Sequence, residues 1–64
     1  MLKELKIAIE KCQVVSIHTK NGTVVMGTPE KTSMLSKVKL RNETGVTYIP
    51  YDDLVHVMRL IAFP

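Results

Sequence analysis

The sequence predicts a mainly β domain that begins with one short α-helix and continues as five short antiparallel strands. Apolar residues recur at three- and four-residue steps only near the start, and in most of the remainder they alternate with polar residues. Pairs that favour turns, rich in asparagine and glycine, separate the alternating runs. The predicted helix covers residues 2–12, and the predicted strands cover about 13–20, 23–28, 34–41, 46–50 and 54–61.

The length limits what can stabilise this fold. A chain of 64 residues has room for one domain, residues 1–64. It buries only about 60% of the surface that its unfolded form exposes, so it gains from a metal, disulfides or self-association. Cys12 is the single cysteine, so no intrachain disulfide can form, and no Cys/His cluster suggests zinc. We therefore predict no metal and no cofactor, and we expect self-association.

Composition and charge exclude other classes. No apolar run approaches the roughly 18 residues of a membrane span, and the first residues lack the apolar region of a signal peptide. We expect a cytoplasmic protein without a membrane partner. The formal net charge of +3 is mildly basic, a value that nucleic-acid-binding domains share with many others.

The predicted helix is amphipathic. Leu2, Leu5 and Ile9 follow helical spacing, with lysine and glutamate between them. A helix of about three turns is unstable alone, so it should pack on the strands and cover an open end of the sheet. We expect Cys12, at its end, to be a small buried hydrophobic residue.

The segment from Val14 to Met26 predicts a β-hairpin. Asn21-Gly22 is the strongest short signal for a two-residue turn in which both residues have positive φ. In the first strand, the predicted inward-facing residues are Val15, Ile17 and Thr19.

The next strands are predicted from two glycines that suit bends or turns and from the alternation of apolar and basic residues. Gly27 permits a sharp bend or bulge, and Gly45 suits a left-handed position in the next turn. After Gly27, the polar segment 28–33 either ends an edge strand or forms a loop. In the third strand the inward-facing residues are Val38 and Leu40, and the basic outward-facing residues are Lys37, Lys39 and Arg41.

The last part of the chain contains a predicted helical turn and a final strand. Pro50 ends regular pairing, and Tyr51 to Leu54 resembles one tight turn in which Asp52 and Asp53 satisfy backbone N–H groups. Val55 to Ile61 is apolar enough for a strand covered on both faces.

This order of elements resembles the Sm-like branch of the SH3-like small barrels, in which a helix precedes five bent strands. The resemblance covers nearly the whole chain, and its first motif is similar to that of the Hfq proteins. It implies a ring of subunits, in which the fourth strand of one pairs with the fifth of the next, and binding of single-stranded RNA. The residues that carry it are Asn21, Gly22, Gly27, Val38 and Leu40.

A second motif resembles other small proteins. Where Hfq proteins have Tyr-Lys-His, which closes their uridine pocket, this chain has Pro50-Tyr51-Asp52. The run from Ile49 to Leu54 is similar to that of YolD-like proteins, and the layout is similar to Rof, which acts through protein contact. These resemblances imply a non-enzymatic regulatory or protein-interaction module, with Hfq-like RNA binding as the alternative.

The candidate binding residues are basic. A stripe of this kind is typical of phosphate binding, and a solvated strand face that discourages edge aggregation has the same composition. Stacking aromatics would favour RNA, but none lies in the basic run. The candidate residues for RNA or a protein partner are Lys20, Lys31, Lys37, Lys39 and Arg41.

No catalytic residue is predicted. Asp52 and Asp53 are adjacent and point apart, unlike the facing carboxylates of acid-base hydrolysis. His18 and His56 are expected to be surface or edge residues. Met26, Met34 and Met58 are expected to fill the core or an interface.

The C-terminal segment has more apolar residues than one face of a strand needs. Some of them are therefore expected to contact another copy, in a ring or in a dimer. The predicted interface residues are Val57, Met58, Leu60, Ile61 and Phe63.

Overall fold

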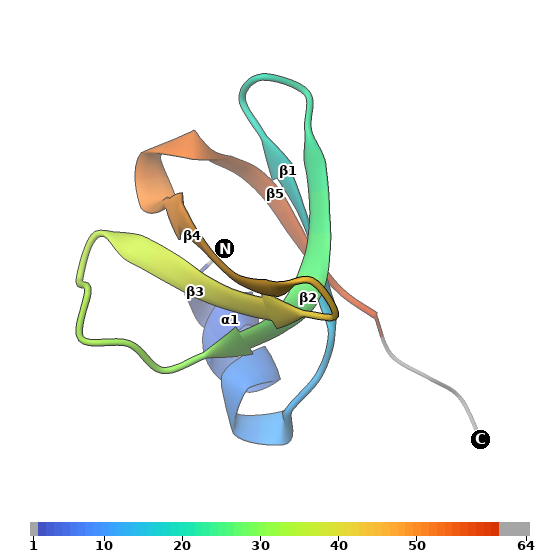
Figure 1. Cartoon of the computed structure of the whole chain (residues 1–64), viewed down its shortest axis with the longest axis vertical. Helices are drawn as coiled ribbons and strands as arrows, with labels where there is room; N and C mark the ends of the chain where they lie inside the picture. Colours follow the sequence, from blue (N-terminus) through green and yellow to red (C-terminus); the bar gives the residue numbers. More distant parts are fainter. Residues whose placement is uncertain (1, 61–64) are drawn as a thin grey trace.

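The structure is a computed structural model that describes residues 2–60 (Figure 1). Five antiparallel strands form one sheet in the order β4-β3-β2-β1-β5, preceded by a helix. The predicted mainly β class with an N-terminal helix is confirmed. The elements are α1 (Leu2–Lys11), β1 (Val15–Thr19), β2 (Val24–Glu30), β3 (Lys37–Asn42), β4 (Gly45–Pro50), the 3₁₀ turn η1 (Tyr51–Asp53) and β5 (Leu54–Arg59).

Strand β2 belongs to both halves of the sheet. It pairs with β1 as far as Gly27 and with β3 from Thr28 onward. A Cβ atom on Gly27 would lie 2.7 Å from the carbonyl oxygen of Arg41 and 2.9 Å from Cγ of Leu40. The strand therefore crosses β3 closely at the residue where it changes partner, as the bend predicted at Gly27 requires. Figure 1 shows β2 running from beside β1 to beside β3.

The edges of the sheet are β4 and β5. No ladder joins these two strands within the part of the chain that the structure describes. The predicted closure into a barrel therefore remains a prediction, and each edge strand has one side available for pairing.

The core lies between the sheet and α1. Inward alternation is confirmed for Val15 and Ile17 in β1 and for Val38 and Leu40 in β3, which are buried. Thr19, also predicted to face inward, is only partly buried. The helix contacts β2 and β5 and contributes Leu5 and Ala8 to the core. The other buried apolar residues are Ile49, Leu54 and Val57, with Val25 and Tyr51 packed against them.

One ion pair fastens α1 to the sheet. Arg59 on β5 donates from Nε to Oε2 of Glu4 over 2.6 Å and from a terminal nitrogen to Oε1 of Gln13 over 3.3 Å. Both contacts are partly buried, so they are better shielded from water than an exposed pair. They link residues that are more than forty positions apart.

The β1–β2 turn differs from the prediction. Only Gly22 has positive φ, at 83°, and its N–H donates to the carbonyl of Thr19 over 3.0 Å. The loop therefore has three residues, Lys20 to Gly22, and the two-residue turn with positive φ at Asn21 is wrong. Asn21 instead accepts a hydrogen bond from the N–H of Thr23 through Oδ1 over 3.1 Å. Asparagine side chains commonly cap turns in this way.

The end of α1 also differs. The helix ends at Lys11, and Cys12 is exposed with φ of 54°. The prediction of a buried Cys12 is therefore wrong. The left-handed backbone at Cys12 ends the helix and turns the chain. The side chain of Cys12 therefore does not join the buried helix face that contains Leu5 and Ala8.

The strand bounds shift by up to three residues. Residues 13–14 precede β1, and residues 34–36 belong to the loop before β3. Strand β2 continues through Pro29 to Glu30, so the first half of the polar segment is strand and the second half is loop. Gly45 has the positive φ that its turn position predicts.

Strand β5 corrects two predictions about the C-terminal segment. Thr19 pairs with Leu54 and His18 with His56, so Val55 is an extra residue in a bulge. The bulge leaves two consecutive residues exposed and returns Val57 to the core at 6% exposure. Val57, a predicted interface residue, is therefore buried in the core of the single chain, and β5 is not covered on both faces there. The predicted interface residues Ile61 and Phe63 lie outside the described residues.

Candidate functional site

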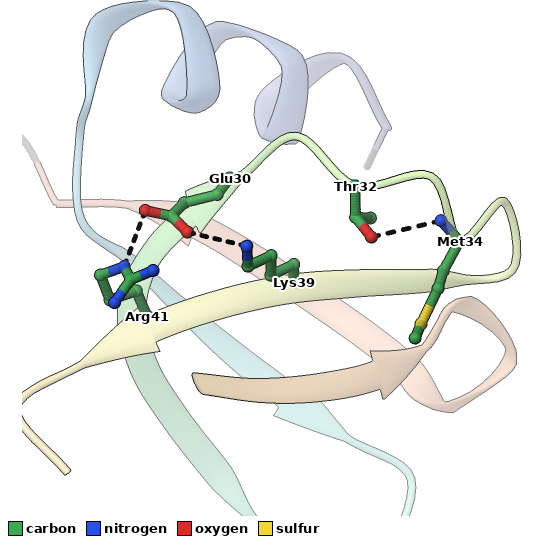
Figure 2. Close-up of polar contacts among 5 residues, drawn as sticks. All are labelled: Glu30, Thr32, Met34, Lys39 and Arg41. Atoms are coloured by element: carbon green, nitrogen blue, oxygen red, sulfur yellow. Dashed lines mark hydrogen bonds and ion pairs between the residues drawn. The ribbon is translucent and has the colours of Figure 1, made fainter. Parts of the chain in front are cut away.

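The basic residues of β3 share one face but are not all free. Lys39 pairs across the sheet with Glu30 on β2, and Arg41 pairs with Thr28. Arg41 donates from Nε to Oε2 of Glu30 over 2.8 Å, and Nζ of Lys39 lies 3.4 Å from Oε1 of the same carboxylate. Figure 2 shows Glu30 between the two cations.

The electrostatics of this cluster follow from the hydrogen bond. The hydrogen bond that Arg41 donates, together with the positive charges of Arg41 and Lys39, lowers the pKa of the Glu30 carboxyl. The same contact raises the pKa of the Arg41 guanidinium. Glu30 therefore stays ionised at neutral pH and offsets one of the three positive charges on this face.

The other two predicted basic residues lie at opposite ends of β2, and Lys31 lines a pocket together with Lys37 and Lys39. Lys20 lies in the loop before β2, whereas Lys31 directly follows β2 at its other end. Lys37 is exposed at the start of β3, opposite Pro50. The structure thus brings together Lys37, Lys39 and Arg41 as predicted, but Lys20 lies apart from them.

An aromatic residue of the neighbouring strand accompanies the basic strand, although none lies in the basic run itself. Tyr48 on β4 pairs directly with Lys39 and is 40% exposed. Directly opposed residues project from the same face of a sheet. We define the basic face as Lys37, Lys39, Arg41 and Tyr48, together with Glu30.

A pocket of about 330 Å³ adjoins the basic face where α1, the 31–36 loop and η1 meet. Two contacts hold the loop beside it: the N–H of Met34 donates to Oγ1 of Thr32 over 3.2 Å (Figure 2), and the N–H of Tyr51 donates to the carbonyl of Ser36 over 2.9 Å. Its polar and charged lining includes Lys6, Lys31, Lys37, Lys39 and Tyr51.

A second surface is apolar. Ser16 on β1 pairs with Met26 on one side and with Met58 on the other, and His18 pairs with Val24 and His56 in the same way. The N–H of Leu60 continues this pattern by donating to the carbonyl of Val14 over 2.8 Å. We define the apolar face by its five aliphatic members, each at least 37% exposed: Val14, Val24, Met26, Met58 and Leu60.

The exposure of these side chains bears on two predictions: that the methionines fill the core or an interface, and that apolar residues near the C-terminus contact another copy. Met26, Met34 and Met58 are all about half exposed, so none of them is a core residue. Met58 and Leu60 are available for contact, as the predicted interface requires. A hollow of about 650 Å³ borders the apolar face and extends from Val14 and Met26 to the β3–β4 turn.

The acidic turn has no capping role. Asp52 and Asp53 are exposed on η1, and no side chain among residues 2–60 caps that turn. The prediction that they satisfy backbone N–H groups is wrong.

Comparison with protein-family models and with curated proteins finds no match to this chain. None of the described helices is long and apolar enough to cross a membrane. Within residues 2–60, no group of three or more His, Cys, Asp and Glu side chains is placed to hold a metal ion.

The sequence did not reveal three of these features. Glu30 between two cations, Tyr48 opposite Lys39, and His18 opposite His56 each depend on the register between strands. The hydrophobic pattern shows which side a residue faces, but not which residue lies beside it. Knowledge of the β2–β3 register would have identified Glu30.

Proposed function

We propose that this chain is a small, non-enzymatic binding module of the Sm-like kind that acts through protein contact, including contact with copies of itself. The observation that carries the proposal is the apolar face. Val24 and Met26 lie on β2 and Met58 on β5, Val14 and Leu60 lie where β1 begins and β5 ends, and the polar Ser16 and His18 of β1 lie between the two rows.

An exposed patch of this kind has a physical consequence. Monomeric proteins rarely leave large contiguous apolar areas in water, and such areas commonly mark interaction sites. Burying apolar surface contributes roughly 25 cal/mol per Å², so covering these side chains favours association. The face also ends at β5, an edge strand whose outer backbone groups can pair with another chain.

The proposal is tested by self-association. We expect the wild-type mass, measured by sedimentation equilibrium in EDTA, to rise with protein concentration in the micromolar range. The double substitution Met26→Lys and Met58→Lys should prevent this rise, because it places two charges in the centre of the apolar face. Both side chains are about half exposed, so the fold should survive.

The matched control is Leu35→Lys. Leu35 is 92% exposed in the 31–36 loop, outside the apolar face. This variant should associate like the wild type. A wild type that stays monomeric at all concentrations would count against self-association, and equal loss in the control would show that added charge alone is responsible.

Single-stranded RNA binding is the second candidate function. Tyr48 beside Lys39 and Tyr51 in the lysine-lined pocket favour it, because basic grooves with aromatic side chains bind single strands by charge and stacking. Glu30 opposes it by offsetting charge on the basic face. A titration with oligo-uridine and oligo-adenine at two salt concentrations distinguishes the two functions.

For a protein-contact module we expect no salt-sensitive oligonucleotide binding, and no difference between the wild type and a Lys37/Lys39/Arg41 alanine triple variant. Tight binding at low salt that weakens with salt and is lost in the triple variant would favour the RNA function instead.

A further inference from the structure

The two histidines of the chain face each other across the last two strands of the sheet, β1 and the edge strand β5. His18 on β1 pairs with His56 on β5, and their ring centroids are 5.8 Å apart with the planes at 89°. Both side chains are exposed. The bulge at Val55 contributes to this arrangement, because bulges redirect the side chains beside them.

We propose that His18 and His56 form half of a zinc site, which a second copy of this chain completes with its own two histidines. The inference rests on the proposed self-association and adds a metal ion to the contact that the apolar faces of the two copies make.

The spacing of the rings fits one metal ion. Tetrahedral zinc binds imidazole nitrogen at about 2.0–2.1 Å, which places the centroids of two bound rings about 5 Å apart. The observed 5.8 Å is close to this separation. Rotation about χ2, a broad torsion in histidine, turns the two ring nitrogens toward a common point.

The site needs ligands from outside the chain. Structural zinc prefers four protein ligands, and the described residues offer no group of three or more His, Cys, Asp and Glu side chains. In a dimer with twofold symmetry the same patch of both copies meets at the axis. An ion on that axis receives two imidazoles from each copy.

The dimensions of packed sheets permit this arrangement. Two sheets that pack face to face lie about 10 Å apart, and a histidine side chain spans about half of that gap. Val24 lies beside His18, and Met58 follows His56 on the same face of β5. These apolar neighbours would cover the ion when the two faces meet, which strengthens the metal–ligand interaction by excluding water.

The test uses zinc chloride as the probe and the full chain. We expect addition of half an equivalent of zinc to shift the mass measured by sedimentation or light scattering to that of a dimer. Calorimetry should give one zinc ion per two chains, and EDTA should reverse the shift. His18→Gln and His56→Gln should each abolish the zinc-dependent shift, with circular dichroism confirming that both variants are folded.

The exposed thiol of Cys12 provides the control. Cys12→Ser should keep the full response to zinc, because Cys12 lies at the end of α1 and outside the outer face of β1 and β5. Loss of the response in Cys12→Ser, or its survival in both glutamine variants, would overturn the zinc site. So would one zinc ion per monomer without a change in mass.

The two proposals fail separately. Association in EDTA that zinc does not change, and that Met26→Lys with Met58→Lys abolishes, would overturn the zinc site and leave self-association standing. A chain that stays monomeric with and without zinc would overturn both.

Discussion

Cys12 is the residue whose backbone is least suited to its side chain. Its N–H donates to the carbonyl of Ile9 over 3.4 Å, and the N–H of Gln13 donates to that of Ala8 over 2.9 Å. This pair of bonds is the Schellman arrangement, which ends helices and usually places glycine in the left-handed position. A residue with a β-carbon pays about 1–2 kcal/mol to adopt that backbone.

Cys12→Gly should therefore stabilise the protein. Part of the gain is offset because glycine has more freedom in the unfolded chain, so we expect about 0.5–1 kcal/mol in the free energy of unfolding. Urea denaturation followed by circular dichroism measures it. Cys12→Ser keeps the β-carbon and should change little; a similar gain in both variants would attribute the effect to the thiol rather than to the backbone.

Glycines act for different reasons in two elements. Gly22 lies in the β1–β2 loop with φ of 83°, and no atom of the described part of the chain lies within 4 Å of the position that a Cβ would take. Gly27 lies within β2, where a Cβ would meet the backbone of β3 at Arg41 and the side chain of Leu40. Gly22 is required for its left-handed backbone conformation, whereas Gly27 is required because β3 leaves no space for a side chain.

Substitution by asparagine separates these two needs. At Gly22 asparagine tolerates the left-handed region, so Gly22→Asn should cost less than Gly22→Ala in free energy of unfolding. At Gly27 any β-carbon collides with β3, so both alanine and asparagine should cost about 1–3 kcal/mol or more. Chemical denaturation of the four variants checks this. A mild Gly27→Ala would mean that β2 and β3 can separate without loss.

The whole molecule depends on a small core. One helix covers the interior of the bent sheet, and Leu5 is its largest core side chain within the described residues. At roughly 0.05–0.15 kcal/mol per residue, a domain of this size has only about 3–10 kcal/mol of stability. Losing one core contact therefore removes a large fraction of the total.

Leu5→Ala is expected to lower the free energy of unfolding by about 2–5 kcal/mol, since it leaves a cavity between α1 and the sheet. Leu35→Ala removes the same atoms from a side chain that is 92% exposed, against 3% for Leu5, and should change stability little. Thermal unfolding by calorimetry compares the two. Equal effects would show that α1 does not depend on Leu5 for its packing.

The spacing of apolar residues along the sequence was enough to predict the helix, the strands and most of the residues that face the core. The helical spacing of Leu5 with its neighbours and the alternation through Val15, Ile17 and Val38 identify buried faces correctly. Such patterns succeed because the periods of 3.6 and 2 residues belong to the backbone itself and need no knowledge of distant residues. In β5 the apolar run offered no such alternation, and the bulge at Val55 decides that Val57 is buried.

Tertiary structure alone decided which side chains meet. Glu30 contacts Arg41 because β2 changes its partner at Gly27, and His18 faces His56 because β5 returns beside β1 in a register set by a bulge. These pairings join residues 11 and 38 positions apart through loops whose length does not encode the register. The sequence by itself therefore determined the fold class, most of the inward-facing residues and the basic alternation of β3. The position of Glu30 and Tyr48 beside that strand, and the whole apolar face, arose only when separate strands were placed side by side.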